Sequence, residues 1–172
     1  MELKTRLFLG IFVVGLVADQ LSKLWIVENV HYGEILVWIP GFLDITHARN
    51  PGGAFSFLAD APVVGRMTFF IGATITAIVL LILFFRRLEP EDRFAAFALG
   101  GILAGAVGNL IDRIVYGEVI DFIDVHLWAG YIWPTFNLAD SFIVVGIGLL
   151  FFDLFGHDED EAADTTDPPP PR

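Results

Sequence analysis

The chain has 172 residues, of which 55% are hydrophobic and only 18% are charged, and it contains no cysteine. A soluble domain carries about 25% charged residues, so this composition indicates an integral membrane protein instead. The lack of cysteine excludes disulfides, thiolate metal sites and cysteine nucleophiles. The formal net charge of −11 argues against nucleic-acid binding, although much of it lies in the C-terminal tail.

Four segments are predicted to be transmembrane helices, at about residues 7–27, 66–85, 94–113 and 137–155. The second and third contain uncharged runs of 19 and 18 residues, close to the roughly 20 that a span requires. The first and fourth carry polar groups within or beside their apolar runs, including Asp19, Lys23 and Asp140. The first could alternatively be a cleaved signal peptide, but no A-x-A cleavage site follows it, which favours a span.

Positive charges near the helix ends predict that both termini are cytoplasmic. Arg86, Arg87 and Arg93 crowd one short loop on the same side as the N-terminus, and cytoplasmic loops carry an excess of such residues. The outer loops are then 28–65 and 114–136. Residues 1–156 form the membrane domain, and residues 157–172, acidic and ending in four prolines and an arginine, are predicted to be a disordered tail.

The first outer loop contains the signature of a β-hairpin at residues 42–58. Its first part is rich in strand-forming residues, the Asn-Pro-Gly-Gly sequence at 50–53 is a turn signal, and 54–58 is predicted to be the return strand. The predicted fold class is therefore an all-α integral membrane protein with four transmembrane helices and a small extracytoplasmic β-hairpin or cradle.

Charged residues gather at the outer ends of the predicted helices: Asp19, Asp112, Arg113, Asp121 and Asp140. Ionisable groups in a membrane are costly and commonly functional, so their shared depth is the main functional signal. Each also has a local explanation. Asp19 and Lys23 have the i, i+4 spacing of a helical ion pair, which could simply ease the helix out of the bilayer. Asn109, Asp112 and Arg113 could cap the end of the third helix, with Gly117 just beyond it. Asn137 and Asp140 have the N-cap and N3 spacing of a helix start.

Two aspartates that converge in a low-dielectric pocket share a proton and can activate water for attack on a peptide carbonyl. Asp121 and Asp124 would face opposite sides of an extended segment, so only one of them could join such a site. No serine has an evident histidine partner, and the histidines lack a metal-binding spacing, so His47 and His126 are predicted to be surface residues. A Gly-x-x-x-Gly pattern at Gly101 and Gly105 predicts close helix packing inside the bundle rather than dimerisation.

Five sequence blocks occur in order and resemble those of bacterial lipoprotein signal peptidases, the type II signal peptidases. They are Asp-Gln-Leu-Ser-Lys at 19–23, Asn-Pro-Gly-Gly-Ala-Phe at 50–55, Gly-Asn-Leu-Ile-Asp-Arg at 108–113, Gly-Glu-Val-Ile-Asp-Phe at 117–122 and Phe-Asn-Leu-Ala-Asp at 136–140. The resemblance implies a four-helix aspartyl endopeptidase of the bacterial cytoplasmic membrane. Such an enzyme cleaves diacylglyceryl-modified prolipoproteins before the lipidated cysteine and is blocked by globomycin-type inhibitors.

The resemblance also assigns roles. It implies that Asp121 and Asp140 are the catalytic pair. The residues that would line the site are Asn50, Asn109, Arg113 and Asn137. Those that would support it are Asp19, Lys23, Gly108, Asp112 and Ala139. It implies no cofactor or metal, and as partners only prolipoproteins and membrane lipids, with no nucleic acid and a monomeric enzyme. The rival classes are a small transporter or proton carrier and a purely structural or partner-binding membrane protein.

Overall fold

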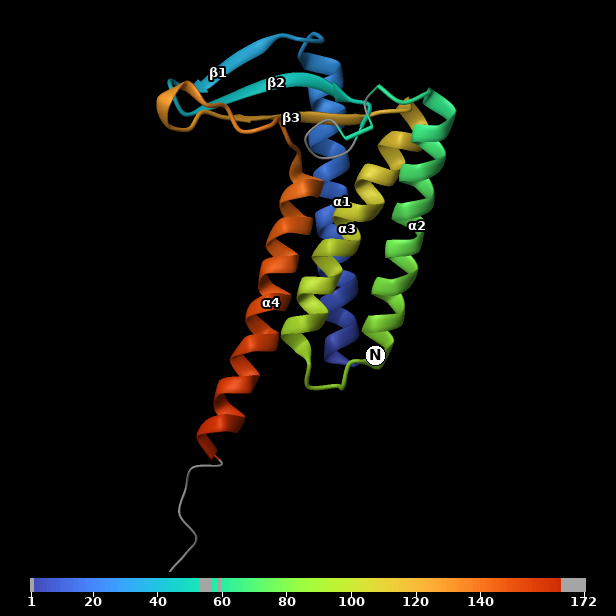
Figure 1. Ribbon diagram of the computed structural model, residues 1–172, viewed down its shortest axis with the longest axis vertical. Helices are drawn as coiled ribbons and strands as arrows, with labels where there is room; N and C mark the ends of the chain where they lie inside the picture. Colours follow the sequence, from blue (N-terminus) through green and yellow to red (C-terminus); the bar gives the residue numbers. More distant parts are fainter. Residues whose placement is uncertain (1, 53–56, 59, 165–172) are drawn as a thin grey trace, which may run out of the picture.

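The computed structural model describes residues 2–52, 57–58 and 60–164. Within them, four long helices run side by side and a small sheet lies across one end of the bundle (Figure 1). The helices are α1 (Leu3–Asn29), α2 (Val63–Arg87), α3 (Arg93–Tyr116) and α4 (Leu138–Asp164). The strands are β1 (Ile35–Ile39), β2 (Leu43–Asn50) and β3 (Val119–Val125), and a short 3-10 helix, η2, spans Trp128–Gly130.

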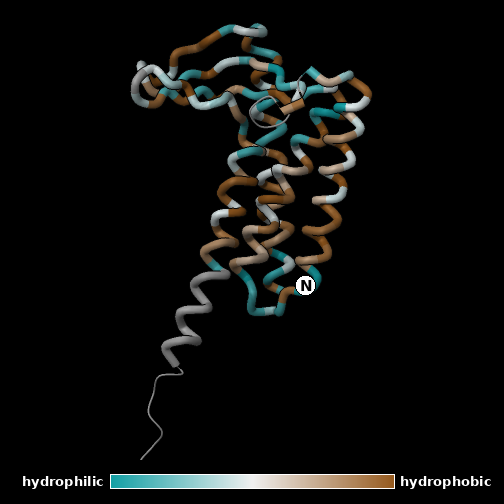
Figure 2. The backbone as a smooth tube through the Cα atoms, in the orientation of Figure 1, coloured by the Kyte–Doolittle hydropathy of each residue, from teal (hydrophilic) through white to brown (hydrophobic). Residues whose placement is uncertain are grey.

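Three helices in the described part of the chain are long and apolar enough to cross a membrane: α1, α2 and α3. The hydropathy colouring in Figure 2 shows their middle parts as largely hydrophobic. The fourth predicted span corresponds to α4, which has 27 residues. Its uncharged stretch, 141–152, is only 12 residues long, so composition does not single it out as a span.

The helix α3 is the centre of the bundle and packs against α1, α4 and α2. Its small residues permit this because their backbone lies directly against the neighbouring helices. A Cβ atom placed on Gly105 would fall 2.2 Å from the carbonyl oxygen of Ala139 in α4, and one on Gly100 would fall 2.5 Å from that of Phe8 in α1. The glycine face predicted from the sequence therefore does pack inside the bundle.

The sheet is antiparallel, with strand order β1-β2-β3. It differs from the predicted hairpin, because β2 pairs with β1 on one side and with β3, from the second outer loop, on the other. The predicted return strand at 54–58 falls partly outside the described residues, and Phe57 and Leu58 lie in a turn. Pairing of β2 with a distant segment depends on long-range register, which a local strand signal does not contain.

Two further expectations differ from the structure. His47 was expected at the surface but is 5% exposed, since its ring nitrogens bond to the Val30 carbonyl and to Arg49. The helix α4 continues to Asp164, through the first part of the segment for which the sequence predicts a disordered tail; residues 165–172 lie outside the described part. Extending an existing helix through residues such as Ala162 and Ala163 requires no new nucleation.

Candidate active site

Two aspartates from different elements lie at the sheet end of the bundle and are linked by a shared set of hydrogen bonds. Asp121 is the third residue of β3, and Asp140 is the third residue of α4. The side chain of Asn137, immediately before α4, donates to Asp121 Oδ1 at 2.7 Å. Asn109 on α3 donates to Asp140 Oδ1 at 2.8 Å, and the two asparagines contact each other at 3.2 Å. Local strand and helix geometry thus delivers both acids to one polar network.

The start of α4 fixes Asp140 by reciprocal capping. The Asp140 backbone N–H donates to Asn137 Oδ1 at 2.9 Å, and the Asn137 backbone N–H donates to Asp140 Oδ2 at 3.3 Å. This is the capping box predicted from the spacing of the two residues, and it satisfies donors that a helix start otherwise leaves free. The cap and the network involve the same two residues through different hydrogen bonds, so the local explanation and the functional one do not compete.

Three asparagine side chains point their amide nitrogens at the two acids, and each is held in that orientation by an obligate donor behind it. Asn50 donates to Asp121 Oδ2 at 3.0 Å while its own oxygen accepts the Gly52 N–H. The Asn137 oxygen accepts the Asp140 N–H. The Asn109 oxygen accepts from the ammonium of Lys23 at 2.9 Å. An amide whose oxygen faces a fixed donor must turn its NH₂ group the other way.

Asp121 is 2% exposed and has a strongly perturbed pKa. Burial, and then the neighbouring charge of Asp140, raise the pKa of Asp121 from its ordinary value near 3.8 to about 7. The hydrogen bonds from Asn50 and Asn137 and the charge of Lys23 act in the opposite direction, but they are weaker. At neutral pH Asp121 is thus close to half-protonated, as expected of one member of a carboxyl pair that shares a proton.

Behind the asparagines lies a buried ionic cluster between α1 and α3. The ammonium of Lys23 lies 3.0 Å from Asp19 Oδ2 and 2.7 Å from Asp112 Oδ2, and the three residues are at most 2% exposed. The cluster also holds two other elements, because Asp19 accepts the Ala139 N–H of α4 and Asp112 accepts the Ile120 N–H of β3. A pair that merely eased a helix out of the bilayer would be exposed, so that alternative for Asp19 and Lys23 is wrong.

Arg113 links the outer loop to the bundle. Its guanidinium donates to the carbonyl of Gly52 and to that of Asn109, both at 3.3 Å. It also lies 4.9 Å from the centre of the Phe70 ring on α2, within the range of a cation–π contact. The side chain is half-buried.

The chain resembles several known proteins over most of its length. The family model for signal peptidase (SPase) II matches residues 11–156. The lipoprotein signal peptidase of Geobacter metallireducens is 42% identical over 92% of this chain and 96% of its own length. That of Cellvibrio japonicus is 49% identical over 86% of this chain and 85% of its own.

The chain belongs to the signal peptidase II family. This is an aspartic peptidase family, so the protein is an aspartic endopeptidase with membrane-spanning helices. A solved bacterial membrane enzyme is 34% identical and superimposes with a TM-score of 0.79, covering 96% of this chain and 94% of its own. A second gives a TM-score of 0.77 at 37% identity, covering 86% and 91%.

The peptidase brings together every residue that the sequence predicted for the site, and it leaves Asp124 out. Asp124 accepts a hydrogen bond from the Thr135 hydroxyl at 2.5 Å, and no contact described for it reaches Asp121 or Asp140. The sequence-based prediction left out two residues that hold the scaffold around the site without touching either acid. Gln20 donates to Asp19, to Asp112 and to the Gly108 carbonyl, and Gly52 contributes its backbone to Asn50 and Arg113. Both lie inside the family sequence blocks, which was the available signal.

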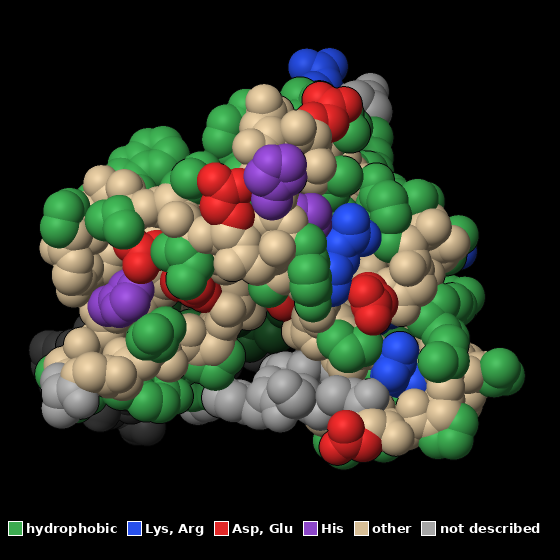
Figure 3. Space-filling view, turned by 90° about the horizontal axis from the view of Figure 1, so that it is seen from above, with side chains coloured by type: hydrophobic (Ala, Val, Ile, Leu, Met, Phe, Trp, Pro, Cys, Tyr) green, Lys and Arg blue, Asp and Glu red, His purple; other side chains and the backbone are tan. Residues whose placement is uncertain are grey.

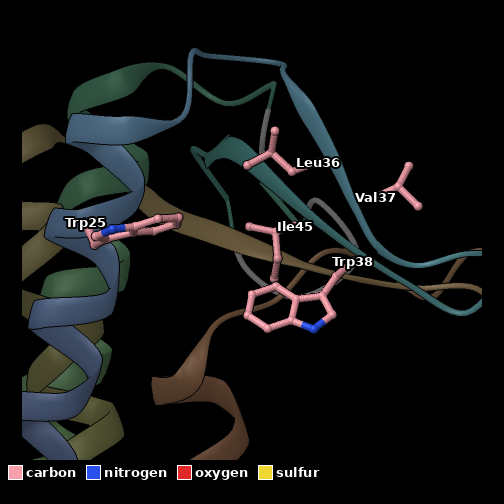
Figure 4. Close-up of a pocket in the computed structure, with 5 residues that line it drawn as sticks. All are labelled: Trp25, Leu36, Val37, Trp38 and Ile45. Carbon is pink, nitrogen blue, oxygen red and sulfur yellow. The ribbon is translucent and has the colours of Figure 1, made fainter.

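An apolar pocket of about 270 Å³ lies between α1 and the sheet of the peptidase, apart from the polar network. Its lining residues are Trp25, Leu36, Val37, Trp38 and Ile45, as the close-up in Figure 4 shows.

Seen from the sheet end in Figure 3, charged and histidine side chains are interspersed with many hydrophobic ones. The sheet end is therefore neither a purely polar nor a purely apolar surface.

Proposed function

We propose that the protein removes signal peptides from diacylglyceryl-modified prolipoproteins, cleaving before the lipidated cysteine by water activation on Asp121 and Asp140. The observation that supports this most directly is the hydrogen-bonded network that joins the two acids. Asp121 and Asp140 are held by Asn137 and Asn109, which contact each other, and one acid carries a pKa near neutrality. A carboxyl pair that shares a proton near neutral pH can supply both the base and the acid for attack by water.

The proposed topology has four spans, with both termini in the cytoplasm and the sheet outside. Besides the three apolar helices, α4 packs along α3 and is long enough to cross a bilayer. The arginine cluster Arg86, Arg87 and Arg93 lies at the opposite end from the sheet, which favours a cytoplasmic position for that end. The acids then lie near the outer surface of the bacterial cytoplasmic membrane, where the scissile bond of a lipid-anchored substrate would be found.

In the proposed mechanism Asp140 is the charged member and Asp121 the protonated one. Asp140 is in the first turn of α4, where the helix dipole favours a negative charge, and both of its oxygens accept N–H groups. It takes a proton from water as the oxygen attacks the peptide carbonyl, while Asp121 gives its proton to the carbonyl oxygen. Collapse of the tetrahedral intermediate returns that proton to Asp121, and Asp140 gives its proton to the leaving amine.

Side chains around Asp121 and Asp140 would position the substrate. Arg113 is half-buried and carries a fixed positive charge, which suits the ester or peptide carbonyl oxygens of a lipidated substrate. Asn50 keeps one face of its amide on Asp121 and comes from the outer loop. Asn50 joins that loop to Asp121 and Arg113 joins it to Asn109, so the loop and the reacting bond would be positioned together.

The decisive experiment is cleavage of a purified, lipidated prolipoprotein by the detergent-solubilised protein, with and without globomycin. We expect cleavage before the modified cysteine by the wild type, and none by Asp121→Asn or Asp140→Asn, each still inserted in the membrane. Asp124→Asn is the matched control, because this acid lies on the same strand, and we expect near-normal cleavage. Retained activity in either variant of the pair would remove the model. Loss in Asp124→Asn with activity in Asp121→Asn would mean that the wrong acid was chosen.

A further inference from the structure

Lys23 makes three short contacts in a buried site. Its ammonium is within 3.0 Å of Asp19, 2.7 Å of Asp112 and 2.9 Å of the side-chain oxygen of Asn109, and the residue is 2% exposed. An ammonium group has three protons to donate, so each contact takes one. Two carboxylates already balance its charge, so the contact with Asn109 is not needed for neutralisation.

We propose that Lys23 is a positioning residue for the reaction, acting on Asp140 through the orientation of the Asn109 amide. The inference rests on the proposed function of the pair and goes beyond it, because Lys23 touches neither acid. An ammonium group only donates hydrogen bonds, so it draws the Asn109 oxygen toward α1. The NH₂ group of Asn109 is then turned toward Asp140, where it donates at 2.8 Å.

Without the ammonium, the Asn109 oxygen loses the shorter and charged of its two hydrogen-bond donors. The remaining donor to its oxygen is the NH₂ group of Asn137, at 3.2 Å. That NH₂ group also donates to Asp121, at the shorter distance of 2.7 Å. A reversed Asn109 would turn a carbonyl oxygen toward the Asp140 carboxylate. The two acceptors would repel each other, and Asp140 would lose the hydrogen bond that joins it to the network of Asp121.

Other contacts show why the orientation depends on Lys23 rather than on packing. The Asn109 nitrogen and oxygen are nearly equal in size, so steric fit does not choose between them. Gln20 reaches the same two carboxylates as Lys23 but makes no described contact with Asn109. The cluster therefore offers a matched comparison, in which one residue touches Asn109 and the other does not.

The test compares Lys23→Met with Gln20→Leu and Asn109→Ala in the prolipoprotein cleavage assay, measuring kcat, KM and the melting temperature in detergent. We expect Lys23→Met to lower kcat by about 100-fold with little change in KM, the loss typical of a misplaced catalytic group. Gln20→Leu should keep kcat near wild type even if its melting temperature falls. The double variant Lys23→Met/Asn109→Ala should be no slower than Asn109→Ala, because both changes act through one contact.

Three results would overturn the inference. The first is a kcat that Lys23→Met leaves unchanged, and the second is a loss of kcat that follows the fall in melting temperature equally in Lys23→Met and Gln20→Leu. The third is a double variant in which the kcat losses of the two single changes multiply. If Lys23→Met does not fold, Lys23→Met/Asp112→Asn replaces it, since this pair of changes leaves the cluster with its original net charge. Cleavage by wild type together with an active Lys23→Met would refute this inference alone. Absence of cleavage by wild type would remove the proposed function and the inference with it.

Discussion

The backbone N–H of Ala139 donates a 2.9 Å hydrogen bond to Oδ1 of Asp19, a residue 120 positions earlier in the chain. This bond joins the first turn of α4, which carries Asp140, to the middle of α1. Both partners are fully buried, and the other oxygen of Asp19 is taken by Lys23. The position of one acid of the pair is therefore set by a carboxylate that takes no part in the proposed chemistry.

Gly108 makes this arrangement possible, and its replacement by alanine is expected to disrupt it. A Cβ atom at Gly108 would lie 2.3 Å from Asp19 Oδ2, and that oxygen is held by Lys23 and cannot retreat. Overpacking of this kind costs about 1–3 kcal/mol, and here it also displaces the contact with Ala139. We expect Gly108→Ala to lower the melting temperature and to abolish most cleavage.

Gly101→Ala is the matched control on the same helix. A Cβ atom there would have its nearest neighbour at 3.8 Å, an ordinary contact, and alanine favours the helix by up to about 1 kcal/mol. Activity and melting temperature should be equal to or above those of the wild type. Equal losses in both variants would show that glycine is needed along α3 for a reason other than the closeness of Asp19.

The raised pKa of Asp121 predicts how the stability of the protein changes with pH. The folded state holds this proton up to about pH 7, whereas the unfolded chain releases it near 3.8. Stability from the neutral group is therefore complete below pH 4 and declines as pH rises to about 7, by at most about 4 kcal/mol. We expect Asp121→Asn, which stays neutral, to show a smaller fall in melting temperature between pH 4 and 8 than the wild type. An equal fall in both would contradict the assignment.

The same proton predicts the alkaline limit of cleavage. If Asp121 must be protonated, kcat/KM should fall as pH rises through the pKa, about 7. The hydrogen bond from Asn50 favours the charged form and lowers this pKa, so Asn50→Ala should raise it and move the alkaline limit to higher pH. Residual activity of Asn50→Ala, measured from pH 5 to 9, tests this. The limit should not move in Asp124→Asn, and a downward shift in Asn50→Ala would be the opposite of what the geometry requires.

Local patterns in the sequence predicted the parts of the site that are made by neighbours in the chain. The capping box of Asn137 and Asp140 follows from a three-residue spacing. Gly117 adopts a left-handed backbone conformation at the end of α3, as glycine commonly does directly after a helix. Alternation along an extended segment predicted that Asp121 and Asp124 face apart. It did not by itself say which of them faces the site. The motif resemblance assigned that role to Asp121, and in the structure Asp121 bonds to Asn50 and Asn137 whereas Asp124 bonds to Thr135.

What the sequence missed depends on contacts between distant segments. The pairing of β2 with β3, residues 43–50 with 119–125, sets Ala48 opposite Asp121 and brings Asn50 within reach of it. Lys23 has the same spacing from Asp19 whether the pair is exposed or buried, and only the approach of α3 buries it. Gln20 has no distinguishing local signal, since its partners are on α3 as well as on its own helix.

The proposed topology places the sheet at the outer interface, and Trp38 reports on that depth. Trp38 is 68% exposed and lines the apolar pocket with Trp25, which is near the sheet end of α1 (Figure 4). Tryptophan prefers the headgroup level of a bilayer. In liposomes, a variant that retains Trp38 as its single tryptophan should be quenched more by lipids brominated near the glycerol than by lipids brominated deep in the chain. With Ile75→Trp in the middle of α2 as the single tryptophan, the order should reverse. If neither lipid quenched Trp38, the sheet would lie in water, away from the membrane surface.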